Sequence, residues 1–189
     1  MIDIDRLIEI RWHGRGGQGA VTSAEMLARA AILEGKYAQA FPSFGPERRG
    51  APVLAFVRID SKQPVRVRAE ITEPDVVVVL DSGLLSIMNV AAGLKAGGVV
   101  VINTKDNVEQ LRKAFGNDCL LATVDASGIA REVLGVPITN TTMIGAVVKA
   151  TGVIKLESLI EPLKHRFGRL AEKNIEAVRK GYEQTSLKG

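Results

Sequence analysis

Cysteine and histidine are nearly absent from this sequence of 189 residues, which has one cysteine and two histidines. A single thiol cannot form an internal disulfide, and it cannot supply the four thiolates that an iron–sulfur cluster usually takes from a protein. His13 and His165 lie far apart in sequence, which argues against a structural zinc site. Cys119 stands in an apolar run and is expected to be a small buried hydrophobic residue. The sequence therefore predicts neither a metal site nor a redox centre of its own.

Long apolar runs are also missing, since the longest one, Val76–Leu80, is far shorter than the ~20 residues of a membrane span. Residues 1–9 alternate acidic and apolar side chains and lack the basic-then-apolar layout of a signal peptide. Aromatic residues make up only 4% of the chain and are not interleaved with basic residues, as base-stacking proteins require. These observations predict a cytoplasmic protein that binds neither membranes nor nucleic acid. The net charge of +4 suits phosphate-bearing small molecules or acidic partner proteins instead.

What the sequence does contain is an alternation of strand-like and helix-like segments. Aliphatic runs typical of parallel strands buried on both faces occupy Val76–Leu80, Val99–Ile102 and Leu120–Val124. Further strands are expected at residues 8–13, 36–41 and 53–59, and an extended segment with one apolar and one basic face at 64–71. Helices are expected at residues 20–31, 143–151, 156–167 and 170–185. The pattern predicts a single α/β module over residues 1–189: a doubly wound, mostly parallel sheet with helices on both faces and a helical C-terminal tail.

A glycine-rich loop follows the first expected strand. Its sequence is Gly14-Arg15-Gly16-Gly17-Gln18-Gly19, which fits the pattern G-x-G-x-x-G between a strand and a helix. Glycines allow the backbone to approach a ligand closely, and the N-terminus of the next helix offers free N–H groups and partial positive charge. The guanidinium of Arg15 can hold a phosphate or a carboxylate bidentately.

A dinucleotide site would also need an acidic residue at the end of the second strand to hold the ribose. Residues 38–42 contain no acidic residue, and Glu34 comes before that strand. NAD is therefore disfavoured. Three interpretations of the glycine loop remain: a site for another anion, a contact with a partner subunit, and tight packing of a helix on the sheet.

The loop and several later blocks resemble the gamma subunit of pyruvate and 2-oxoisovalerate:ferredoxin oxidoreductases. The blocks that carry the resemblance stand in family order across residues 8–182 and are His13–Thr22, Gly35–Tyr37, Gln39–Pro42, Phe44–Val53, Arg66–Arg68, Glu73–Asp81 and Asn140–Ala146. The Ala51-Pro52 step that follows Arg49-Gly50 is closer to the pyruvate-type members than to those that use 2-oxoglutarate.

The resemblance implies reversible oxidative decarboxylation of a 2-oxoacid to an acyl-coenzyme A, with electrons passing to ferredoxin or flavodoxin. It places thiamine pyrophosphate and iron–sulfur clusters on alpha, beta and delta subunits, and it associates the gamma module with coenzyme A. The residues expected to meet that cofactor or a partner are Gly14, Arg15, Gly16, Gly17, Gln18, Gly19, Arg48 and Arg49. The isolated chain is expected to be inactive, because it contains neither cluster cysteines nor a Gly-Asp-Gly thiamine motif.

The other chemistry-bearing residues have simpler structural interpretations. His13 could act as an acid or base, since its ordinary pKa lies near neutrality, but a hydrogen-bonded structural role is expected. Asp81 and Asp125 each end a strand before a helix and are expected to cap it. Trp12 and Phe41 are expected in the core or at a subunit contact. Two alternative functions stay open: a stand-alone nucleotide-binding oxidoreductase, and a non-enzymatic regulatory or ligand-binding module.

Overall fold

The protein is described by a computed structural model that covers residues 4–43, 50–106 and 108–189. Its strands are β1 Ile8–Arg15, β2 Tyr37–Pro42, β3 Pro52–Asp60, β4 Val76–Val79, β5 Val99–Asn103, β6 Leu120–Val124 and β7 Ser186–Lys188. Its α-helices are α1 Ala20–Leu33, α2 Val108–Phe115, α3 Ala126–Leu134, α4 Asn140–Thr151, α5 Ile160–Phe167 and α6 Ala171–Gln184. Short 3-10 turns occur at η1 Ser82–Ser86, η2 Leu156–Leu159 and η3 Gly168–Leu170.

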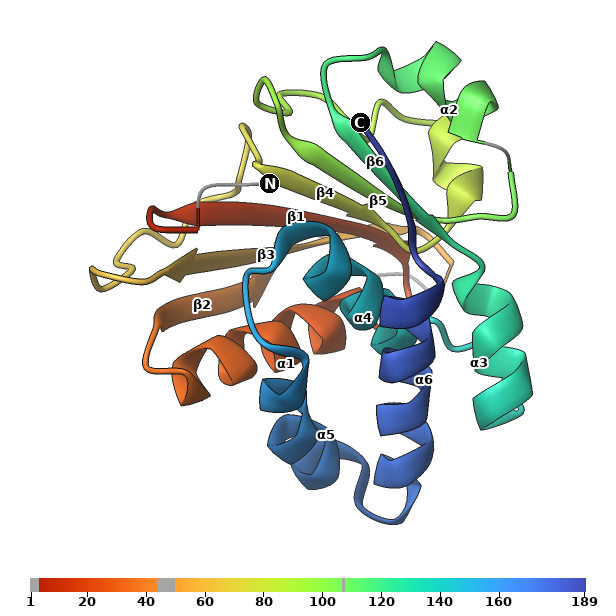
Figure 1. Ribbon diagram of the computed structural model, residues 1–189. Coiled ribbons are helices and arrows are strands. Elements are labelled where there is room, and N and C mark those ends of the chain that lie inside the picture. The colour runs from red at the N-terminus through yellow and green to blue at the C-terminus, as the bar shows by residue number, and fades with distance from the viewer. Residues whose placement is uncertain (1–3, 44–49, 107) are drawn as a thin grey trace.

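All of these strands join one sheet in the order β2-β3-β1-β4-β5-β6-β7 (Figure 1). The central strands β1, β4, β5 and β6 are parallel to one another. On one flank β3 pairs antiparallel with both β1 and β2, and on the other flank β7 pairs antiparallel with β6. The α/β class and the parallel centre are thus as predicted, and the sheet is mixed because antiparallel pairs flank this centre.

The four central strands separate two hydrophobic cores. Side chains alternate between the faces of a strand, so Val76 and Val78 enter the core beneath the helices α1 and α4, while Val77 and Val79 enter a second core. That second core is closed by η1 and α2, through Leu84 and other apolar residues. Burial on both faces explains why these strands are continuous aliphatic runs rather than alternating ones.

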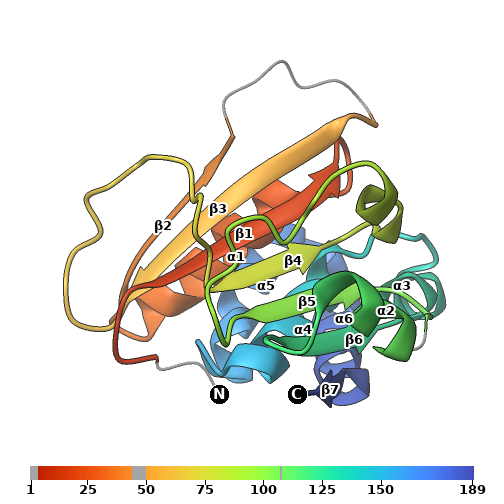
Figure 2. The same cartoon turned by 90° about the horizontal axis from the view of Figure 1, so that it is seen from above.

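Helices cover the two faces unequally. The helices α1, α4, α5 and α6 lie behind the sheet in Figure 2, whereas η1 and α2 lie in front of β4, β5 and β6 only. The front of β2, β3 and β1 is crossed by the chain that links β3 to β4 and by no helix. Helices on both faces, as the sequence predicted, are therefore found on the parallel half, and one face of the antiparallel half is without them.

Two segments differ from the sequence-based expectations. Residues 64–71 form no ladder with any described strand, and Arg58 of β3 holds this segment through the carbonyl groups of Val67 and Ala69. At the other end of the chain the helical tail ends at Gln184. It is followed by a short strand, β7, which was not predicted. β7 pairs with β6 through Leu187 and Ala122, so it covers the edge that β6 would otherwise expose.

Helix α4 is buried almost all round because it lies between the sheet and α6. The two helices touch backbone to backbone at glycines. A Cβ at Gly145 of α4 would overlap the carbonyl oxygen of Val178, and a Cβ at Gly181 of α6 would overlap that of Thr142. The close approach accounts for the glycine in the Asn140–Ala146 block that contributed to the family resemblance.

Candidate functional site

A polar cavity lies at the carboxyl ends of the parallel strands, where ligands of open α/β sheets usually bind. Its volume is about 470 Å³. Charged and amide groups line it at Gln18, Asp81, Asn103, Lys105, Asp106 and Asp125, and hydroxyl groups at Ser82, Thr104, Ser127 and Thr139. The cavity therefore offers many hydrogen-bonding groups and few apolar ones.

The glycine loop borders this cavity and leads into α1. Gly19 has φ 82° and its backbone lies against the Asn140 side chain, so a side chain at this position would be both strained and obstructed. Gly17 has φ 92° and faces open space. No side chain caps the first turn of α1. The backbone N–H groups at the start of this helix therefore retain the donor capacity that the sequence predicted.

Arg15 and Gln18 converge on one carboxylate. Arg15 Nε and Gln18 Nε2 donate hydrogen bonds to Asp81 Oδ2 over 2.9 and 3.0 Å, and the Arg15 guanidinium also donates to the Gly50 carbonyl. Although burial raises the pKa of Asp81, the hydrogen bonds from Gln18, Gly83 N and Arg15 lower it more. Asp81 is thus a carboxylate that neutralises Arg15 and orients the loop.

This convergence revises the role predicted for Asp81. The expected capping bond is present, because Asp81 Oδ1 accepts from Gly83 N over 2.9 Å. The same carboxylate also joins the end of β4 to the glycine loop, a contact that was not predicted. Asp125 caps α3 as predicted, accepting from Gly128 N, and it forms an ion pair with Lys105 over 3.3 Å.

Asn103 is the last residue of β5 and was not among the residues predicted for the site. Its Nδ2 donates to the Leu80 carbonyl and to Ser127 Oγ, and its Oδ1 accepts from Ser127 N. One side chain thus joins the carboxyl ends of β4 and β5 to the start of α3. Its role is to fix the floor of the cavity rather than to react.

Arg48 and Arg49 lie outside the described residues. Within the ranges that the structure describes, no group of three or more His, Cys, Asp or Glu side chains could hold a metal ion. Over the same ranges, no helix is both long and apolar enough to span a bilayer.

His13 faces away from this cavity and into the interior. It is 2% exposed, and its Nε2 accepts from Arg11 Nε over 3.1 Å. Burial and the charge of Arg11 lower the pKa of His13 to about 4, against a smaller opposing effect of the Val90 carbonyl. Accepting a bond at Nε2 leaves the ring proton on Nδ1. His13 is therefore a neutral structural residue, as expected, and not an acid or base of the site.

Arg11 is buried, and it interacts with carbonyl groups rather than with a carboxylate. Its guanidinium donates to the carbonyl oxygens of Ile71, Thr72, Val90 and Ala92, which come from two separate loops. The arginine thereby holds both loops against the face of β1 that no helix covers. Cys119, Trp12 and Phe41 are buried, as the sequence predicted.

The topology gives a second argument against a dinucleotide site. In a Rossmann unit the strand after the first helix lies parallel beside the first strand. Here β2 follows α1 but is separated from β1 by β3. Glu34, the nearest acid, is occupied elsewhere: it accepts from Lys36 and Ser158, and these bonds hold its pKa low despite the effect of burial.

The fold is an α/β sheet with an anion-friendly loop at a polar cavity beside the carboxyl ends of its parallel strands. The family model for pyruvate ferredoxin/flavodoxin oxidoreductase matches residues 9–184, and the chain belongs to this family. Its place in the family is that of the gamma subunit.

Relatives support this position along nearly the whole length. The Pyruvate/ketoisovalerate oxidoreductases common subunit gamma of Thermococcus litoralis is 59% identical over 181 residues, covering 95% of this chain and 97% of that protein. Pyruvate synthase subunit PorC of Methanothermobacter thermautotrophicus is 54% identical, covering 94% and 96% respectively.

Solved structures show the same fold. Pyruvate oxidoreductase subunit PORC of Thermotoga maritima superposes with a TM-score of 0.87 at 40% identity, covering 97% of this chain and 99% of that chain. A 2-oxoglutarate:ferredoxin oxidoreductase from Magnetococcus marinus superposes with a TM-score of 0.76 at 22% identity, covering 95% of this chain but 31% of that chain. The second likeness shows that the module also occurs as one part of a longer chain.

Proposed function

We propose that this gamma subunit supports the reversible oxidative decarboxylation of pyruvate or a related 2-oxoacid, and that its glycine loop contributes to coenzyme A binding. The observation that carries the proposal is the convergence of Arg15 and Gln18 beside the uncapped N-terminus of α1, at the edge of the polar cavity. Backbone N–H groups, a guanidinium and a side-chain amide are the donors that phosphate groups take up.

The fit to a phosphate has one condition. Asp81 already accepts from both Arg15 and Gln18, so an incoming anion must compete with this carboxylate for the same donors. The side chains of Arg15 and Asp81 are 31% and 25% exposed. Solvent therefore reaches this ion pair, and the free energy needed to separate it is small. Arg15 would then bind the phosphate, and Asp81 would keep its bond from Gly83.

The oxidation itself is assigned to other chains. With one cysteine, which is buried, this subunit supplies no cluster ligands of the usual kind. Thiamine pyrophosphate and the iron–sulfur clusters belong in this proposal to alpha, beta and delta subunits, and ferredoxin or flavodoxin accepts the electrons. The contribution of the gamma subunit is to hold coenzyme A and to complete the assembly.

Substitutions at Arg15 and Asp81 should change coenzyme A affinity in opposite directions. Arg15→Ala removes a charge-assisted bond worth about 1.5–3 kcal/mol, so the KM for coenzyme A should rise roughly ten- to a hundredfold. Asp81→Asn removes the competitor, a partly exposed ion pair of about 0.5–1 kcal/mol, so this KM should fall about two- to fivefold. Steady-state kinetics of the reassembled enzyme measures both values.

The KM for pyruvate is the internal control, because the 2-oxoacid is handled at thiamine on other subunits and should be unaffected. Arg48→Ala combined with Arg49→Ala tests the other predicted arginines in the same assay. A KM for coenzyme A that does not change with Arg15→Ala would remove this residue from the site. Equal losses for both substrates would instead assign Arg15 to the subunit interface.

A further inference from the structure

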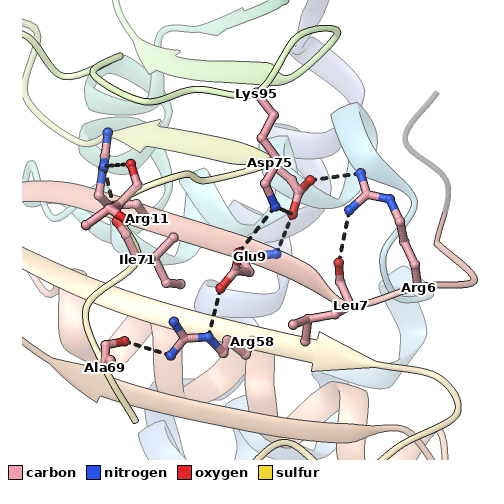
Figure 3. Close-up of polar contacts among 10 residues, drawn as sticks. Arg6, Leu7, Glu9, Arg11, Arg58, Ala69, Ile71, Asp75 and Lys95 are labelled. Carbon is pink, nitrogen blue, oxygen red and sulfur yellow. Dashed lines mark hydrogen bonds and ion pairs between the residues drawn. The ribbon is translucent and has the colours of Figure 1, made fainter. Parts of the chain in front are cut away.

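The face of the sheet that lacks helices is unusually polar. Side chains that alternate with the first core point to this face: Glu9, Arg11 and His13 from β1, and Arg58 from β3. Arg58 is 4% exposed and its Nε donates to Glu9 Oε1 over 2.9 Å. Figure 3 shows Glu9 between Arg58 and Asp75, with Lys95 beside Asp75. Ion pairs thus hold one part of this face, and the apolar cluster of Phe41, Phe56 and Ile71 holds another.

The extended segment of residues 64–70 is fastened to this face by Arg58. One guanidinium nitrogen, Nη1, donates to the carbonyl oxygens of Val67 and Ala69 over 3.1 and 2.7 Å. Two carbonyls two residues apart that face the same donor are typical of an extended chain, whose carbonyls alternate in direction. Because Arg58 is buried and paired with Glu9, the position of the segment is fixed from below.

The alternation determines which backbone groups are free. In an extended chain the N–H and C=O groups of one residue point to the same side, so those of Arg66 and Arg68 point away from Arg58. Among the described residues, no backbone N–H from 65 to 70 has an acceptor. The outer edge of the segment therefore resembles the unpaired edge of a strand.

The outer edge is also basic and partly apolar. Lys62, Arg66 and Arg68 are exposed, and Val67 between the two arginines is 58% exposed. The Arg68 guanidinium lies 5.9 Å from the centre of the Phe41 ring, which keeps this charge close to the sheet. An acidic chain lying alongside would therefore meet free N–H groups, two guanidinium groups and an exposed valine together.

We propose that residues 64–70 form a docking strand for an acidic, extended segment of a partner subunit of the complex. The partner adds by backbone hydrogen bonds to the outer edge, as in other cases of β-strand addition, and its carboxylates pair with Arg66 and Arg68. This inference rests on the proposed assembly with other subunits and adds to it the surface and the chemistry of one contact.

A series of substitutions at Arg66 tests the docking strand, since this residue is exposed and its replacement leaves the core unchanged. The tagged chain is co-expressed with the other subunits, and recovery of these subunits is measured in a pull-down over increasing salt. Arg66→Glu should reduce recovery roughly tenfold or more, because like charges then oppose each other. Arg66→Pro should reduce recovery roughly fivefold beyond Arg66→Ala, because only proline also removes the N–H group.

Lys173→Glu on the exposed side of α6 is the matched control and should recover the subunits at the wild-type level. Wild-type recovery with Arg66→Glu, or equal recovery with Arg66→Pro and Arg66→Ala, overturns the docking strand while leaving the proposed function intact. If the unsubstituted chain itself recovers no other subunit, the proposed function fails, and the docking strand fails with it.

Discussion

Replacing Gly145 with alanine is expected to destabilise the protein by about 3 kcal/mol or more. An added Cβ would overlap the Val178 carbonyl, so α4 and α6 would have to separate and lose contacts along their length. The sign of this change in the free energy of unfolding distinguishes a helix contact at Gly145 from an ordinary helix position. In an ordinary helix interior, replacing glycine with alanine stabilises by roughly 0.8–1 kcal/mol.

Urea denaturation of the parent protein and of Gly145→Ala measures this difference in the free energy of unfolding. Gly181→Ala should show a comparable loss, since its Cβ would overlap the Thr142 carbonyl from the other helix. Lys173→Ala, on the exposed side of α6, should stay within about 0.5 kcal/mol of the parent. A stabilising Gly145→Ala would mean that the two helices are farther apart than the structure places them.

Acidification from pH 7 to pH 4 is expected to lower the free energy of unfolding by about 3 kcal/mol through His13 alone. The pKa of His13 is about 4 in the folded protein against an ordinary value of 6.5. Between these values the unfolded chain binds a proton that the folded chain does not, so stability falls as the pH falls. Below pH 4 both states bind the proton, and His13 causes no further loss.

His13→Gln isolates this effect, because glutamine does not titrate and its carbonyl oxygen can still accept from Arg11. The free energy of unfolding of both proteins is measured at several pH values. The slope between pH 6.5 and 4.5 should be flatter in the variant, whatever its stability at neutral pH. Asp81 and Glu34 have lowered pKa values, so their stabilising effects are lost only at more acidic pH and are common to both proteins. Identical slopes would show that His13 is not buried in its neutral form.

The sequence predicted the parallel centre of the sheet well because burial on both faces leaves a direct mark on composition. Val76–Val79 and Val99–Asn103 are aliphatic runs with a polar residue at or just after the end, and the structure places them where that pattern indicates. The antiparallel flanks were harder to predict. β7 has only three residues, all of them exposed, so its place beside β6 depends on where α6 delivers the chain.

Residues 64–71 have the sequence pattern of a strand but join no sheet, whereas β7 joins the sheet without such a pattern. Their alternation of valine and arginine is a strand pattern, but Val67 stays exposed and the segment pairs with no described strand. What fixes it is a buried arginine on another strand, Arg58, whose contacts are set by the three-dimensional arrangement and not by local sequence. The same limit applied to Arg11, a strand residue whose carbonyl partners lie 60 or more positions away.

At the site, local chemistry was predictable and pairing was not. The glycine pattern correctly indicated a tight strand-to-helix turn with an uncapped helix start. Asp81, the partner of Arg15 and Gln18, is 63 or more positions away, just after β4. Its predicted role as a helix cap left no reason to expect a second contact. In the proposed function, an anion at the loop would therefore have to compete with Asp81 for the donors of Arg15 and Gln18.

The central claim is that this chain acts within a larger enzyme and holds none of the redox centres itself. Purification of the tagged chain from its native host, with metal and thiamine analysis and 2-oxoacid-dependent dye reduction, tests this claim most directly. We expect active material to contain thiamine- and cluster-bearing subunits, and the chain purified alone to be colourless and inactive. Stoichiometric iron in the lone chain, or turnover by it without partners, would contradict the account.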